Sequence, residues 1–149
     1  MTDYVINEWF WADLVGEQGE LTRSQTFEAM LRFSRSTDKM IVVFESAFDR
    51  KAWALCKSHD LQTKRIGRAF VRLIRYDLHR CLLVYPRDLP PLPPEVAEQV
   101  KPDDRYLVQT CLKFAGSVLV TTDTPLAETI ARMELPCLDR GAFVARFAS

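Results

Sequence analysis

The chain has 149 residues, 48% of them hydrophobic and 27% charged, with 20 basic and 20 acidic residues. A chain of this length buries about 68–70% of its unfolded surface, so it can fold as one domain without disulfides or a structural metal. No apolar run is long enough to cross a membrane, and the acidic N-terminus lacks the basic start of a secretion signal. We therefore expect a single cytoplasmic domain over residues 1–149.

The cysteines predict reduced thiols in the core. The four are far apart, and each lies in an apolar segment: Cys56, Cys81, Cys111 and Cys137. A zinc site is not expected, because there is no Cys-x-x-Cys pair and the only imidazoles are those of His59 and His79.

The N-terminal segment predicts a short strand that leads directly into a helix. Residues 4–7 form a mostly apolar run that ends in Asn7, and Glu8 then opens a helical pattern that contains Trp9 and Trp11. We expect both tryptophan side chains to be exposed, which favours a surface that contacts a partner.

Two more elements follow before the basic part of the chain. Ser24 is a suitable N-cap for an amphipathic helix. Residues 40–44 form a continuous apolar, β-branched run, which is typical of a strand covered on both faces. Either Glu45 or Ser46 then starts a helix that contains Asp49.

Residues 62–78 predict a long helix with an uneven charge distribution. Four basic side chains fall on one face at i, i+4, i+7 and i+11: Arg68, Arg72, Arg75 and His79. Because like charges on one face repel, this stripe indicates an anionic partner, and guanidinium groups bind the phosphates of RNA well. The alternative is a solvated face that pairs with the acidic residues 1–20 or with the second copy in a homodimer.

The second half predicts a strand, a proline-rich loop and further helix–strand units. Residues 81–85 are apolar, and residues 86–102 contain six prolines and suit an ordered rim loop. A helix then leads into an apolar strand at residues 118–120. Thr124 is expected to cap the next helix, with Pro125 in its first turn. The alternation of strands and helices predicts an α/β fold with three α/β/α layers and a mostly parallel, Rossmann-like sheet.

Two acids stand where chemistry is usual in such a sheet. Asp123 directly follows the strand at residues 118–120, and Asp104 opens the helix before it. Ligands of parallel α/β sheets bind outside the carboxyl ends of the strands, so we expect these carboxylates to converge there. The structural alternative is that Asp104 only caps its helix and Asp123 only shapes a turn.

The same part of the chain resembles the C-terminal half of a PIN domain. The motifs are DDRYL at residues 103–107, LVTTD at residues 119–123, LPCL at residues 135–138 and RGAF at residues 140–143. The resemblance implies a PIN-like α/β fold and a metal-dependent ribonuclease, with an RNA-processing or a toxin-like role and an antitoxin as a protein partner.

The resemblance also implies the ligands of a Mg²⁺ or Mn²⁺ ion. Asp104 and Asp123 match the family's acids, with Asp103 beside them, and the acid after the second strand is Asp49 or Glu45, of which Asp49 is preferred. The first strand of the family ends in Asp, but this chain has the neutral Asn7, followed by Glu8.

Two functions follow from this set of residues. Crowded carboxylates repel unless a cation lies between them, and such a cation activates water for hydrolysis of RNA, with Asp104, Asp123 and Asp49 as the catalytic residues. Alternatively, Asn7 weakens the site, and the chain is a PIN-like module that binds RNA or a protein partner.

Overall fold

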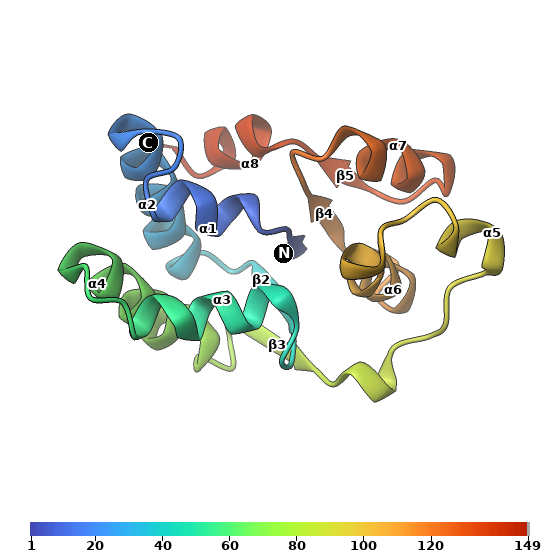
Figure 1. Cartoon of the computed structure of the whole chain (residues 1–149), viewed down its shortest axis with the longest axis horizontal. Helices are drawn as coiled ribbons and strands as arrows, with labels where there is room; N and C mark the ends of the chain where they lie inside the picture. The colour runs from blue at the N-terminus through green and yellow to red at the C-terminus, as the bar shows by residue number, and fades with distance from the viewer. Residues whose placement is uncertain (149) are drawn as a thin grey trace.

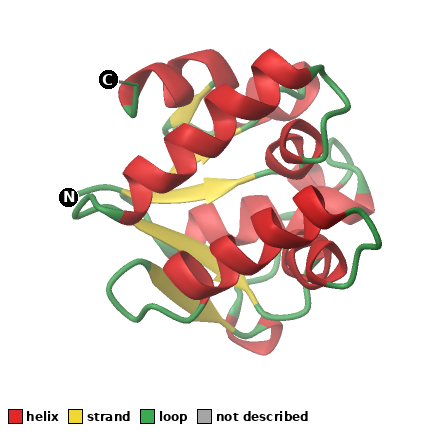
Figure 2. Ribbon diagram, turned by 90° about the vertical axis from the view of Figure 1, so that its left-hand side faces the viewer, coloured by secondary structure: helices red, strands yellow, loops and turns green. Residues whose placement is uncertain are grey.

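The computed structural model describes residues 1–148 and contains a five-stranded sheet with the order β3-β2-β1-β4-β5 (Figure 1). All neighbouring strands are parallel. The strands are β1 (Asp3–Ile6), β2 (Lys39–Val43), β3 (Cys81–Val84), β4 (Val118–Val120) and β5 (Cys137–Leu138). Helices cover both faces of the sheet (Figure 2), which confirms the predicted three-layer α/β class.

The helices separate the strands along the chain. They are α1 (Trp9–Leu14), α2 (Glu20–Ser34), α3 (Ala47–Cys56), α4 (Leu61–Phe70), α5 (Pro94–Ala97), α6 (Arg105–Lys113), α7 (Thr124–Arg132) and α8 (Arg140–Arg146). Parallel neighbours require such crossovers, because a tight turn can join only antiparallel strands.

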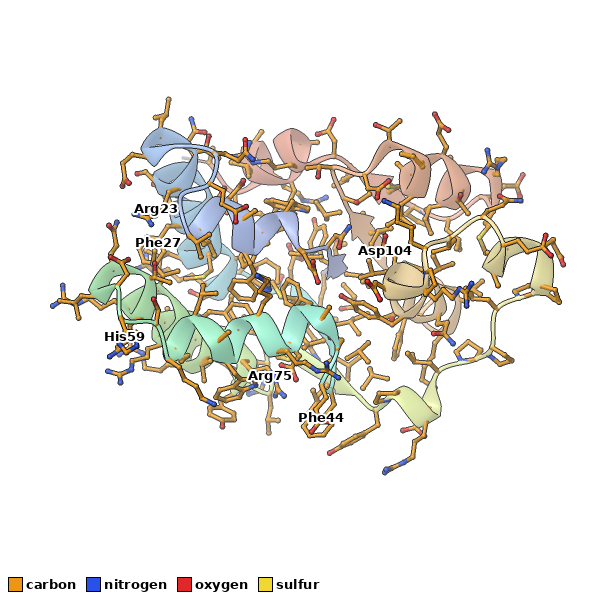
Figure 3. All side chains as sticks on the ribbon, in the orientation of Figure 1. Arg23, Phe27, Phe44, His59, Arg75 and Asp104 are labelled. Carbon is orange, nitrogen blue, oxygen red and sulfur yellow. The ribbon has the colours of Figure 1, made fainter. Side chains whose placement is uncertain are left out.

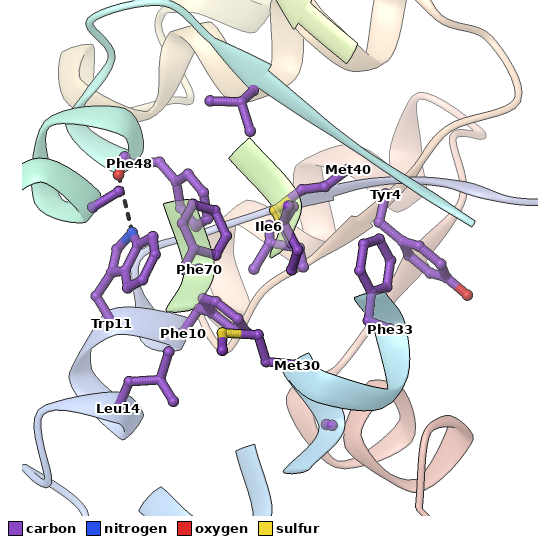
Figure 4. Close-up of a cluster of buried hydrophobic side chains, with 14 of the residues drawn as sticks. Tyr4, Ile6, Phe10, Trp11, Leu14, Met30, Phe33, Met40, Phe48 and Phe70 are labelled. Atoms are coloured by element: carbon purple, nitrogen blue, oxygen red, sulfur yellow. Dashed lines mark hydrogen bonds between the residues drawn. The ribbon is translucent and has the colours of Figure 1, made fainter. Parts of the chain in front are cut away.

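Alternate residues of the strands pack into two different cores. Tyr4 and Ile6 of β1 face a core shared with α1, α2, α3, α4 and α8, which Figure 4 shows in part. Val5 faces the opposite core, where α6 and α7 contribute Leu107 and Ile130. A strand buried on both sides must be apolar at every position, which explains the continuous apolar runs in the sequence.

The two N-terminal tryptophans are buried, so the expectation that they are exposed was wrong. Trp9 and Trp11 keep only 7% and 1% of their accessible surface. Their indole N–H groups donate to the carbonyl oxygens of Val120 at 2.9 Å and Phe48 at 3.0 Å. Both rings therefore hold α1 against the sheet and α3 instead of serving a partner.

Two predicted helix starts, at Ser24 and Thr124, shift in the structure, and the predicted start at Ser46 is confirmed. Ser24 lies inside α2, which begins after Gly19, a residue whose φ of 94° suits only glycine. Ser46 caps α3, because its hydroxyl accepts the N–H of Asp49. Asp123, and not Thr124, caps α7.

The predicted helix at residues 62–78 is shorter and irregular. It consists of α4, capped by Asp60, and a π-helical turn at Val71–Arg75. Each π-type turn contains an extra residue compared with an α-helix, so the side chains after Phe70 rotate away from the direction that α-helical spacing predicts.

None of the helices within residues 1–148 combines the length and hydrophobicity needed to span a bilayer. All four cysteines are free thiols, as expected. Burial raises the pKa of Cys81 to about 11 and that of Cys111 to about 12, so both remain protonated near neutral pH.

Candidate functional site

The strand order reverses between β1 and β4, and their carboxyl ends lie side by side. Ile6 is paired with Val120, and the backbone N–H of Asn7 donates to Val120 O at 3.1 Å. The side-chain amide of Asn7 donates to Thr121 Oγ1, also at 3.1 Å. In open α/β sheets this reversal opens the crevice in which ligands bind.

Asp123 lies at this crevice in a fixed orientation. Its backbone N–H donates to Thr121 Oγ1 at 3.1 Å, and its Oδ1 accepts the N–H of Leu126 at 3.0 Å. The second bond caps α7, so the structural role considered for Asp123 is real. It uses one carboxylate oxygen and leaves Oδ2 for another contact.

Asp104 approaches the same crevice from the start of α6 (Figure 3). Its side chain is half-buried, and within the described part of the chain it makes no capping hydrogen bond to its own helix. Burial raises the pKa of Asp104 above its ordinary value, and the nearby charges of Asp123 and Glu8 raise it further, with Lys101 opposing them. The charges of Asp104 and Asp123 thus interact, and capping does not explain the position of Asp104.

Glu8 and Asp103 complete the acidic surroundings of Asp104. Both side chains are exposed, and both charges act on Asp104, with that of Glu8 the stronger. The side-chain oxygen of Asn7 accepts the backbone N–H of Glu8 at 2.7 Å. We call the three carboxylates of Glu8, Asp104 and Asp123, whose charges interact, the acid edge.

Asp49 does not contribute to the acid edge, contrary to the sequence-based preference. It is buried, and its carboxylate oxygens accept from Arg75 Nε at 2.8 Å and Arg75 Nη2 at 3.2 Å. Asp49 Oδ2 also accepts the backbone N–H of Glu45 at 3.0 Å. A carboxylate engaged in this way is not available as a metal ligand.

Glu45, the other candidate on this segment, adopts an uncommon backbone conformation. Its φ of 58° lies in the left-handed region, and its side chain is exposed just after β2. The charges that shift the pKa of Asp104 are those of Asp123, Glu8, Lys101 and Asp103, and Glu45 is not one of them. Glu45 is therefore not counted in the acid edge.

The basic stripe is also not continuous. Arg75 is only 8% exposed, so including it among RNA-binding side chains was wrong. Arg68 and Arg72 are exposed, as expected. His79 is exposed as well but lies two residues before β3, which places it at the amino edge of the parallel sheet, opposite the acid edge. Figure 3 likewise shows the start of α4, near His59, well separated from Asp104.

The acid edge can be compared with the requirements of a metal ion. Within residues 1–148, no group of three or more His, Cys, Asp or Glu side chains is arranged to hold one. Mg²⁺, however, is often bound by one or two carboxylates together with waters and substrate phosphates. Asp104, whose pKa is raised by burial and by neighbouring acids, and Asp123, whose Oδ2 is not used in capping α7, fit that smaller set.

Sequence reasoning gave no role to two polar side chains near this site. Thr121 orients both Asn7 and Asp123 through its hydroxyl oxygen. Tyr106 lies two residues after Asp104, and burial raises the pKa of its hydroxyl. Both residues belong to the quoted motifs, but their roles depend on neighbours distant in sequence.

Comparisons of this chain with family models, curated proteins and solved structures gave no significant match. The resemblance to PIN domains therefore stays a prediction from short motifs. The strand order and the acid edge define an α/β protein with a candidate acidic site at the reversal point of its sheet.

Proposed function

We propose that the chain is a metal-dependent ribonuclease of PIN type whose site is the acid edge. The observation that supports the proposal is the interaction between the charges of Asp104, Asp123 and Glu8, two of which follow the carboxyl ends of β1 and β4. Hydrolysis of a phosphodiester at such a site requires no Ser or His nucleophile. A toxin-like or an RNA-processing role, an antitoxin partner and a homodimer all stay predictions.

Asp104 and Asp123 would hold Mg²⁺ or Mn²⁺, with Glu8 at the rim. The bound cation would supply an activated water and neutralise negative charge on the phosphate. Thr121 keeps Asp123 in place by accepting its backbone N–H. Without a cation, Asp104 retains its proton to a higher pH than an isolated Asp, because neighbouring acids and burial disfavour its charge.

Metal-dependent cleavage of a mixed RNA pool tests the proposal. We expect cleavage with Mn²⁺ or Mg²⁺, none with a chelator, and a loss of at least about a hundredfold in the Asp104→Asn variant. Glu128→Gln is the matched control, because Glu128 is an exposed carboxylate on α7 outside the acid edge. Equal cleavage by Asp104→Asn and Glu128→Gln would refute the site.

The second candidate is a PIN-like module that binds RNA or a protein partner without cleaving RNA. The neutral Asn7 at the end of β1 favours it, because the site then has one charge fewer. The argument from exposed tryptophans no longer supports it, since Trp9 and Trp11 are buried. RNA binding without cleavage, together with no thermal stabilisation by Mn²⁺, would support this candidate.

A further inference from the structure

A surface hollow of about 290 Å³ lies next to the acid edge, at the carboxyl ends of β2 and β3. Its wall includes Phe44, Ser46, Arg50, Pro86, Tyr106 and Gln109. Tyr106 belongs to α6, whose first turn follows Asp104, and β2 is the direct neighbour of β1. The hollow, which we call the edge hollow, therefore adjoins the acid edge across α6.

Phe44, which lines the edge hollow, packs against Tyr85, an aromatic side chain just outside it. The rings of Phe44 and Tyr85 pack at 5.3 Å between centroids and 57° between planes, and Tyr85 is 40% exposed. The guanidinium of Arg87 lies 4.9 Å from the centre of the Tyr85 ring. Exposed aromatic rings accompanied by Arg are the surfaces on which nucleobases stack.

The wall carries polar side chains, Glu45, Ser46, Arg50 and Gln109, beside apolar ones. Within the described residues, the buried hydroxyl of Tyr106 has no hydrogen bond of good geometry, although Ser46 and the backbone of Phe48 lie close to it. Gln109 is held by a bond from Nε2 to Pro90 O at 2.9 Å, which leaves its carbonyl oxygen as an acceptor. A planar ligand with polar edges would match this wall.

Size and charge restrict the ligand further. Pockets for whole cofactors or drug-sized ligands measure about 300–1,000 Å³, and the edge hollow is at the lower limit of that range. It suits one ring system, and the exposed, oppositely charged side chains of Arg50 and Glu45 both lie at its wall. We propose that the edge hollow is a base-binding subsite, which takes the nucleobase next to the phosphate bound at the acid edge. This proposal rests on the proposed function.

Equilibrium binding without metal tests the subsite separately from cleavage. The probes are a short RNA oligonucleotide and an abasic ribose-phosphate oligomer of equal length and charge, measured by fluorescence anisotropy. The wild type should bind the RNA more tightly than the abasic oligomer. Tyr85→Ala should weaken RNA binding about tenfold, the scale of one lost stacking contact, and leave binding of the abasic oligomer unchanged.

Two more variants complete the experiment. Tyr106→Phe should also weaken only RNA binding, with an unchanged melting temperature, because the hydroxyl it removes lacks a good partner among residues 1–148. Tyr76→Ala is the control, since Tyr76 is 68% exposed but stacks on Trp53, away from the hollow.

The outcomes separate the two proposals. Equal wild-type affinity for both oligomers, or equal effects of Tyr85→Ala on both, would overturn the base-binding subsite. Absence of metal-dependent RNA cleavage by the wild type would overturn the ribonuclease and not the subsite, because the binding comparison contains neither metal nor catalysis.

Discussion

Arg75 and Asp49 form a buried, bidentate ion pair between the π-helical turn and the first turn of α3. The Nε–Oδ1 and Nη2–Oδ2 distances are 2.8 and 3.2 Å, and the two side chains are 7% and 2% exposed. The Arg75 guanidinium also lies 5.9 Å from the ring centre of Trp53. Two residues that the sequence suggested for RNA binding and catalysis thus neutralise each other.

Removal of either partner should strongly destabilise the protein. We expect Arg75→Ala or Asp49→Ala to lower the free energy of unfolding by about 3–5 kcal/mol, because each leaves a buried charge without its partner. Urea denaturation measures this change. Arg72→Ala is the control and should stay within about 0.5 kcal/mol of the wild type, since Arg72 is exposed.

The double variant Asp49→Leu with Arg75→Met provides a sharper test of the same pair. It removes both charges and keeps apolar volume, so it should recover most of the stability lost by the single variants. If the double variant loses as much free energy of unfolding as the two single variants together, the explanation from an unpaired buried charge is wrong.

The free energy of unfolding should depend on the ionisation of Asp104. Its folded-state pKa lies above the ordinary value of 3.8, so the metal-free folded state binds this proton more tightly than the unfolded state. The contribution of Asp104 to stability is therefore full below pH 3.8 and is lost as the pH rises through the raised pKa.

Asp104→Asn removes this titration, so the variant should be more stable than the wild type near neutral pH in the absence of metal. The difference should shrink as the pH falls toward 3.8. Urea denaturation at several pH values measures it, with Glu128→Gln as the control. A variant less stable than the wild type near neutral pH would mean that Asp104 makes a structural contact.

Asn7→Asp should make the thermal stability of the protein more dependent on bound metal. The new carboxylate would add a charge beside Asp123 and Glu8 and replace the amide that donates to Thr121. We expect a lower melting temperature without metal and a larger upward shift on adding Mn²⁺. Asn7→Ala should lower the melting temperature without the larger shift. An equal Mn²⁺ shift in both variants would show that Asn7 lies outside the coordination sphere.

RNA binding by the exposed part of the basic stripe, Arg68 and Arg72, can be tested without changing Arg75. In the double variant Arg68→Ala with Arg72→Ala, RNA affinity should fall, and the slope of log K against log salt should decrease by about 0.7 for each lost contact to single-stranded RNA. The melting temperature should change little. The exposed pair Arg35 and Lys113, replaced by Ala, is the control. Unchanged RNA affinity of the double variant would show that these two arginines are solvated surface residues that do not bind RNA.

The sequence allowed the layers of the fold to be predicted, because strands covered on both faces are apolar at successive positions. The runs at residues 40–44 and 118–120 became β2 and β4 for this reason. The sequence also indicated that the charges of Asp104 and Asp123 interact, since Asp104 precedes α6 and Asp123 follows β4.

Other features depend on contacts that periodicity does not encode. Arg75 follows α-helical spacing from Arg68, but the π-helical turn rotates it inward to Asp49. Trp9 and Trp11 point to different sides of α1, and both are buried because the sheet, α3 and neighbouring helices surround this short helix. The edge hollow combines residues from the ends of β2 and β3 and from α6, so no local motif indicates it.

The position of β1 in the middle of the sheet has a consequence for synthesis of the protein. Asn7 and Thr121, which bond across β1 and β4, are 114 residues apart in sequence. At translation rates of about 5–20 residues per second, β1 leaves the ribosome on the order of ten seconds before β4 exists. During that time the nascent chain has β2 available on one side of β1 and an open, apolar strand edge on the other. The speed of translation therefore sets how long this chain is exposed to aggregation before its sheet can close.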